Sequence, residues 1–134
     1  FAAMRELLDK LRSHHPRMIG VIAVPGDRRD DDIRSVGALA GRMFDALVIK
    51  EDTDVRGREP GAVAALLRES AQAAGLADAC ITTVLNEQDA VRCALGQGQS
   101  GDLIVIFADD ITAVWQTVIA YGQERDGLPN PAPK

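Results

Sequence analysis

The sequence lacks an apolar run of the roughly 20 residues that a membrane-spanning helix needs, and its amphipathic start at residues 1–11 lacks the organisation of a signal peptide. It is also short of positive charge, because 15 lysines and arginines stand against 20 aspartates and glutamates, for a net charge of −5. A nucleic-acid duplex is normally bound by a basic surface, so nucleic acid and the membrane surface are both disfavoured as partners. We therefore expect a cytoplasmic protein.

Cysteine is scarce as well. Cys80 and Cys93 have no second cysteine pair and no histidine at the spacing of a zinc site, so we interpret both as reduced packing residues. His14 and His15, which precede Pro16, fit a solvated connection. The sequence also contains no Gly-Lys-Thr phosphate loop and no nucleophile with an adjacent base. We predict no metal site, and we do not expect this chain alone to hydrolyse or transfer anything.

Four short runs rich in valine and isoleucine predict β-strands at residues 18–24, 46–50, 81–85 and 103–107. Each run is nearly continuous, which is typical of strands buried on both faces. Helical patterns lie between them, at residues 33–44, 63–74, 86–95 and 111–119. The expected end signals are Gly75 after the second helix, Asn86 with Asp89 before the third, and Asp109 or Asp110 before the last, which should stop near Gly122.

Strand and helix thus alternate four times, and right-handed crossovers turn such a chain into a mainly parallel sheet with helices on both faces. The predicted fold class is α/β, a three-layer sandwich built on about four strands. Residues 1–122 form one domain, and the polar, proline-rich residues 123–134 read as a flexible tail. Because the chain starts with Phe1 and enters a helix at once, we expect a domain taken from a longer protein.

Ligands of open parallel sheets bind beyond the carboxyl ends of the strands, so the loops that follow the strands are the candidate site. The first loop, residues 25–32, contains Gly26 for a sharp turn and Arg28 and Arg29, whose planar guanidinium groups suit phosphate or carboxylate. The three aspartates at 30–32 have a structural alternative, since acids in the first turn of a helix cap amides and complement the dipole. They would repel a bare phosphate, so an anion here needs an arginine or a bridging cation.

The second loop, residues 51–61, alternates Asp52, Asp54, Arg56 and Arg58, a mixed surface able to hold a zwitterion. Carboxylates suit a cationic side chain, and arginines suit carboxylate or phosphate. The alternative is a solvated loop with internal ion pairs that contribute little. Pro60 is expected at the first position of the next helix.

Three runs, at residues 20–33, 49–61 and 101–110, resemble in order and spacing the carboxy-terminal lobe of the cyanophycin synthetase family, within the wider Mur ligase group. The resemblance extends from Ala2 to about Gly122 and implies a Rossmann-like domain. It also implies the reaction of the group, in which ATP phosphorylates a carboxylate and an amine attacks the acyl phosphate to give an amide, ADP and phosphate. In this family, arginine is added to side-chain carboxyls of poly-aspartate.

The resemblance further implies site residues and partners. Asp27 and Arg28 match the Gly-Asp-Arg signature near the reaction centre, which makes them the candidate catalytic residues, and Arg28 and Arg29 would lie near phosphate. Asp52, Asp54, Arg56 and Arg58 would lie near the incoming arginine or dipeptide. ATP and Mg²⁺ would be held mainly by a preceding central domain of the same polypeptide, and the arginine and aspartate polymer would be the substrate. An oligomer is possible.

The second loop departs from the muramyl ligase pattern, because Thr53 and Asp54 replace Asn-Pro and Gly57 and Arg58 are inserted. The added acid would suit a guanidinium better than a diaminopimelate head group. Two alternatives stay open: the parent enzyme joins ready-made β-aspartyl-arginine units, or the domain is a binding or assembly module without ligase activity.

Overall fold

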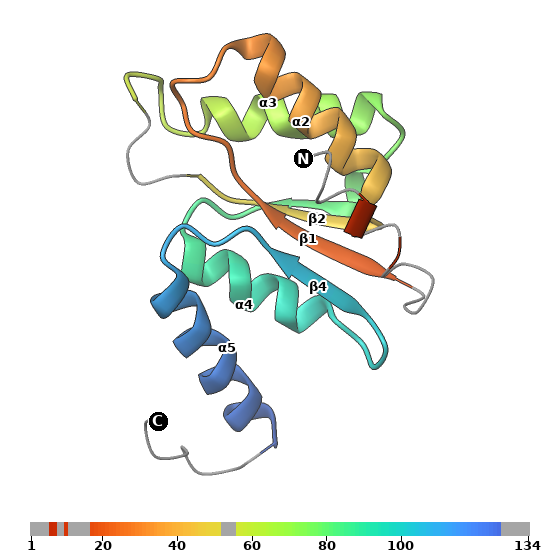
Figure 1. Ribbon diagram of the computed structural model, residues 1–134, viewed down its shortest axis with the longest axis vertical. Coiled ribbons are helices and arrows are strands. Elements are labelled where there is room, and N and C mark those ends of the chain that lie inside the picture. Colours follow the sequence, from red (N-terminus) through yellow and green to blue (C-terminus); the bar gives the residue numbers. More distant parts are fainter. Residues whose placement is uncertain (1–5, 8–9, 11–16, 52–55, 127–134) are drawn as a thin grey trace.

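The computed structural model describes residues 6–7, 10, 17–51 and 56–126, in which strands and helices alternate along the chain (Figure 1). The strands are β1 (Met18–Ile22), β2 (Ala46–Ile49), β3 (Ile81–Thr83) and β4 (Leu103–Ile106). The helices are α2 (Asp30–Met43), α3 (Ala62–Ala73), α4 (Glu87–Gln97) and α5 (Ile111–Asp126), and a short 3₁₀ turn, Asp78–Cys80, precedes β3. All four predicted strands are confirmed, and each ends one or two residues before its predicted end.

The strands form one parallel sheet in the order β3-β2-β1-β4. Helices α2 and α3 cover one face and α4 covers the other, while α5 packs on the outside of α4 (Figure 1). The α/β class with helices on both faces is confirmed. From β1 the chain moves outward through β2 to β3 and then returns to place β4 on the other side of β1, so the strand order reverses between β1 and β4. That reversal is where ligand crevices form in sheets of this kind.

Burial separates the central strands from the edge strands. Every residue of β1 and β2 is buried, whereas β4 is half-buried throughout and only the first residue of β3 is buried. The expectation that all four strands are buried on both faces is therefore wrong for β3 and β4. An edge strand has a neighbour on one side only, so its side chains keep contact with solvent even when the sequence is continuously apolar.

Helices α2 and α3 lie unusually close together because glycine occupies their contact. A Cβ atom placed on Gly37 would lie 2.7 Å from the carbonyl oxygen of Leu67, and one placed on Gly41 would lie 2.7 Å from that of Ala71. Real Cβ atoms do not approach backbone so closely, and overpacking of this kind typically costs 1–3 kcal/mol. These two glycines therefore fix the spacing between the helices that follow the first and second loops.

Most of the predicted helix ends are confirmed. Gly75 follows α3 with φ 114°, a left-handed conformation that suits glycine. The side chain of Asn86 accepts a hydrogen bond from the amide of Asp89 at 3.0 Å at the start of α4. Of the two aspartates expected before α5, Asp110 is the cap, because its carboxylate accepts the amide of Ala113 at 3.1 Å.

Two predicted helix ends are wrong. Pro60 is not the first helical residue, since α3 begins at Ala62 with Gly61 in the left-handed cap position at φ 88°. Helix α5 does not stop near Gly122 but continues to Asp126, so residues 123–126 of the expected tail are helical. The rest of that tail, at 127–134, lies outside the described residues, as do His14, His15 and most of the helix expected at 1–11. Within the described part of the chain, no helix is both long and apolar enough to cross a bilayer.

Candidate functional site

An open pocket of about 370 Å³ lies at the carboxyl edge of the sheet, where the strand order reverses. Residues after three strands line it: Ala23 and Pro25 after β1, Lys50 after β2, and Phe107, Ala108 and Asp109 after β4. A smaller cavity of about 140 Å³ shares Ala23 and Pro25 with it and is also lined by Arg28. The pocket is therefore in the position that the parallel topology predicts for a ligand, with an arginine of the first loop beside it.

A buried ion pair lies at this edge. The Nζ of Lys50 is 3.0 Å from a carboxylate oxygen of Glu87, and these side chains are only 2% and 10% exposed. The Glu87 carboxylate also accepts the backbone amides of Asp109 at 2.6 Å and Asp110 at 3.0 Å. One carboxylate thus joins the end of β2, the start of α4 and the start of α5. We call these contacts the Glu87 hub.

The surroundings of Glu87 lower the pKa of its carboxyl below the ordinary value of 4.5. Burial is the largest single influence and acts in the opposite direction, because it penalises the charged form. The two backbone amides and the ammonium of Lys50 together outweigh burial. Glu87 is therefore an ionised acceptor that holds the wall of the pocket.

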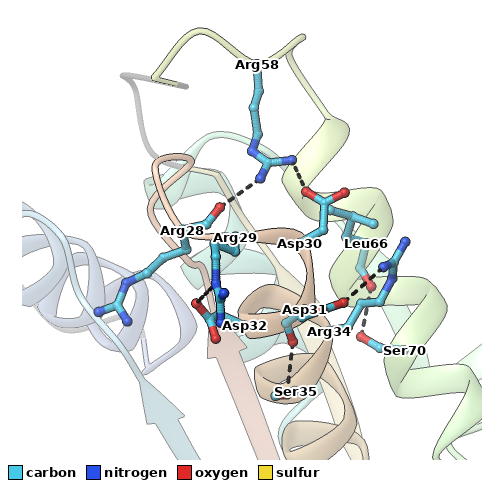
Figure 2. Close-up of polar contacts among 10 residues, drawn as sticks. All are labelled: Arg28, Arg29, Asp30, Asp31, Asp32, Arg34, Ser35, Arg58, Leu66 and Ser70. Carbon is cyan, nitrogen blue, oxygen red and sulfur yellow. Dashed lines mark hydrogen bonds and ion pairs between the residues drawn. The ribbon is translucent and has the colours of Figure 1, made fainter.

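The first loop presents its central side chains to solvent. A turn bond from the amide of Arg28 to the carbonyl of Pro25, 3.2 Å long, shapes the loop, and Asp27, Arg28 and Arg29 are all exposed. The side chain of Arg28 points away from Arg58 and from α2 (Figure 2). The Nε of Arg29 lies 3.5 Å from the carboxylate of Asp32. Of the two predicted phosphate contacts, Arg28 thus lies beside the pocket and Arg29 is paired within the loop.

Each of the three aspartates that follow is paired with an arginine. Asp30 contacts Arg58 at 2.8 Å, Asp31 contacts Arg34 at 3.6 Å, and Asp32 contacts Arg29 (Figure 2). All three aspartates lie in the first turn of α2, as predicted, but no side chain caps the helix amides there. Capping by these acids is therefore not observed, because their carboxylates face arginines.

The second loop is described in part. Asp52 and Asp54 lie outside the described residues, and their predicted contact with substrate stays a prediction. Arg56 is exposed and adopts a left-handed backbone conformation with φ 54°. Arg58 reaches across to the first loop: its Nε donates to the carbonyl of Gly26 at 2.8 Å, its Nη2 donates to that of Arg28 at 2.8 Å, and its Nη1 pairs with Asp30.

The structure brings Arg28 and Arg58 of the predicted set together and adds three residues that the sequence interpretation missed. Lys50 and Glu87 form the buried pair, and Glu51 accepts the amide of Gly61 at 2.8 and 3.0 Å and thereby caps α3. The sequence does contain a weak indication for Lys50, because it is a single charged residue directly after the apolar run of a buried strand. The described residues contain no group of three or more histidines, cysteines or acids placed to hold a metal.

Comparison with known proteins decides the family. A family model described as the Mur ligase, glutamate ligase domain, matches residues 1–109. The chain belongs to the Mur ligase family. The predicted resemblance is thereby confirmed at the level of family, and the Mur ligase domain found here is homologous to parts of ligase enzymes.

Several relatives are cyanophycin synthetases, and two of them show the extent of the match. The one from Geminocystis herdmanii is 38% identical over 103 residues, which cover 77% of this chain and 12% of that protein. The one from Synechocystis is 33% identical over 124 residues, which cover 89% of this chain and 14% of that protein. This Mur ligase domain therefore spans a small part of the length of the relatives it matches.

A solved structure agrees on the fold. The structure of a UDP-N-acetylmuramoyl-L-alanyl-D-glutamate–2,6-diaminopimelate ligase superposes with a TM-score of 0.71 and 18% sequence identity, covering 90% of this chain and 28% of that one. At this identity the similarity concerns the fold, and it supports the Rossmann-like Mur ligase architecture.

Proposed function

We propose that this chain is the carboxy-terminal domain of an ATP-dependent amide ligase of the cyanophycin synthetase kind. Its task is to help position ATP and the incoming arginine while an amide forms at an aspartate side-chain carboxyl. The support is the similarity to cyanophycin synthetases, 38% identical in one case, together with a pocket at the edge where parallel sheets bind ligands. On this proposal the isolated domain is inactive.

The observation that carries the proposal is the position of Arg28. Arg28 lines the cavity that adjoins the main pocket, and its side chain is exposed to solvent next to Asp27. A guanidinium there suits the charge of a phosphoryl group during its transfer from ATP to the carboxylate, and it suits the tetrahedral oxyanion formed when the amine attacks. Asp27 is the neighbouring acid of the candidate catalytic pair, and Arg29 is the second proposed phosphate contact.

The second loop is the proposed substrate loop. Asp52 and Asp54 would receive the guanidinium of the incoming arginine, and Arg56 would receive a carboxylate of the arginine or of the polymer. Opposite charges placed along one loop suit a ligand that carries both signs. The same loop could accept a β-aspartyl-arginine dipeptide, which has the same guanidinium and carboxylates.

We further propose that ATP and Mg²⁺ are held mainly by a preceding central domain of the same polypeptide. ATP supplies the phosphoryl group that activates the carboxylate, and we assign Arg28 as the residue that contacts this group. The described residues offer no acid cluster that fits a metal ion. We therefore assign no residue of this chain to Mg²⁺.

The experiment is kinetic and uses the full-length ligase. With ATP, an aspartate polymer and arginine, we expect ADP release that requires arginine, and Arg28→Ala should reduce it by about 10²–10³-fold, as for loss of one stabilising donor. Arg34→Ala is the matched control, since Arg34 is an exposed residue of α2 that pairs with Asp31. ADP release only with the dipeptide would replace arginine addition by dipeptide joining. No ADP release with either substrate would favour a binding module.

A further inference from the structure

We propose that Arg58 is a positioning residue that sets the conformation of the first loop and does not itself bind the substrate. This inference rests on the proposed function for its effect on catalysis, while the contacts that carry it are independent of any substrate. They join two loops that are separated by about thirty residues in the sequence and meet at one guanidinium (Figure 2). We call them the Arg58 bridge.

The bridge uses every nitrogen of the guanidinium. Nε donates to the carbonyl of Gly26, Nη2 donates to the carbonyl of Arg28, and Nη1 contacts the carboxylate of Asp30, each at 2.8 Å. The side chain is 24% exposed, so it is partly withdrawn from solvent. A guanidinium already engaged on three sides would have to give up these contacts to bind a substrate carboxylate. Its geometry therefore suits an internal role.

The two carbonyls that the bridge holds lie on either side of Asp27. The carbonyl of Gly26 belongs to the peptide plane before Asp27, and the carbonyl of Arg28 belongs to the plane after Arg28. Holding both planes restrains the Asp27–Arg28 pair at its two ends, and with it the direction in which the two side chains leave the backbone. Asp30, the third contact, lies at the start of α2 and ties the same guanidinium to a rigid element. Arg58 of the second loop thus restrains the backbone of the candidate catalytic pair, Asp27 and Arg28.

Only arginine can form this bridge. Its planar fork presents several donors at fixed angles, whereas lysine has one nitrogen and cannot reach two carbonyls and a carboxylate in this arrangement. We therefore expect Arg58→Lys to fail almost as completely as Arg58→Ala. A residue that merely supplied positive charge near the substrate would tolerate lysine much better.

The first test is amide hydrogen exchange on this chain, without substrate. The amide of Arg28 is protected by its bond to Pro25, and Arg58→Ala and Arg58→Lys should both speed its exchange by about tenfold or more, because the loop opens more often. Arg34→Ala, which removes an exposed ion pair on α2, the helix that contains Asp30, should leave that exchange rate unchanged. Unchanged exchange in both Arg58 variants would overturn the proposal.

The second test separates positioning from binding in the full-length ligase. We expect Arg58→Ala and Arg58→Lys to lower kcat by about 100-fold, as small misplacements of reacting groups do, while KM for arginine changes less than about threefold. A large rise in KM with kcat preserved would make Arg58 a substrate ligand and overturn the proposal. If the ligase does not use arginine, the proposed function fails, and the exchange experiment still tests the bridge.

Discussion

Two sets of charged contacts lie at the same edge of the sheet and differ in burial and in what they join. In the Glu87 hub, Lys50 and Glu87 are 2% and 10% exposed and join the ends of β2, α4 and α5. In the Arg58 bridge, Arg58 and Asp30 are 24% and 53% exposed and join two loops. The comparison indicates that the same chemistry has different consequences. The hub should maintain the fold, and the bridge should maintain the site.

Removing the carboxylate of the hub should give the largest loss of stability. Glu87→Ala leaves Lys50 buried without its counter-ion and two backbone amides without their acceptor, so we expect a loss of about 3–5 kcal/mol in the free energy of unfolding. Urea denaturation of this chain measures it. Glu69→Ala, an exposed glutamate on α3, is the control and should be nearly neutral. A loss for Glu87→Ala no larger than that of the control would contradict the role of the hub.

Acid should weaken the hub in a defined direction. The folded-state pKa of Glu87 is lowered below 4.5, so its contribution is fully present above that value and disappears as the pH falls through the lower, folded-state pKa. The urea midpoint should therefore fall as the pH drops below 4.5, and it should fall less steeply in Glu87→Gln, which cannot take up that proton. Equal slopes for wild type and variant would show that Glu87 does not contribute to the acid response.

Removing the Arg58 bridge should lower the free energy of unfolding less than removing the Glu87 hub does. Arg58→Ala deletes three contacts at a partly exposed position, and the carbonyls it leaves behind can bind water, so we expect a loss of about 1 kcal/mol. Thermal or urea unfolding measures it. A loss as large as that of Glu87→Ala would remove the distinction between the two sets of contacts.

A third charged contact should contribute least to the stability of the fold. Arg92 on α4 and Glu124 on α5 form a two-bond pair at 3.0 and 3.2 Å that is largely exposed, since its side chains are 41% and 63% accessible. The pair raises the pKa of Arg92 and lowers that of Glu124, yet salt and water screen exposed pairs. Arg92→Ala should leave the urea midpoint within experimental error. A clear shift would mean that the packing of α5 on α4 depends on this pair.

The sequence predicts the fold well because local signals and the global topology agree. Apolar runs mark the four strands, and residues such as Gly75, Asn86 and Asp110 end or begin helices as expected. What it misses depends on neighbours that are far apart along the chain. The run at 103–107 is as apolar as the first strand, but its place at the sheet edge leaves it half-buried.

The site is less predictable for the same reason. The topological rule locates the carboxyl edge, and the first loop lies there as expected, with Arg28 beside a cavity. The sequence does not indicate that Lys50 and Glu87 meet, since 37 positions separate them and Glu87 lies outside every run that resembles the family. Nor does it separate arginines available to a ligand from Arg58, which contacts the backbone of the other loop.

The glycine contact between α2 and α3 has a consequence for how sites of this kind can diversify. Gly37 and Gly41 hold the two helices at a fixed separation, and each helix begins where one of the two charged loops ends. The distance between the first residues of α2 and α3 is then set by the helix contact and does not depend on the sequence of the loops. Residues can be inserted or exchanged in either loop to suit a new substrate while the distance between the anchors of both loops stays the same.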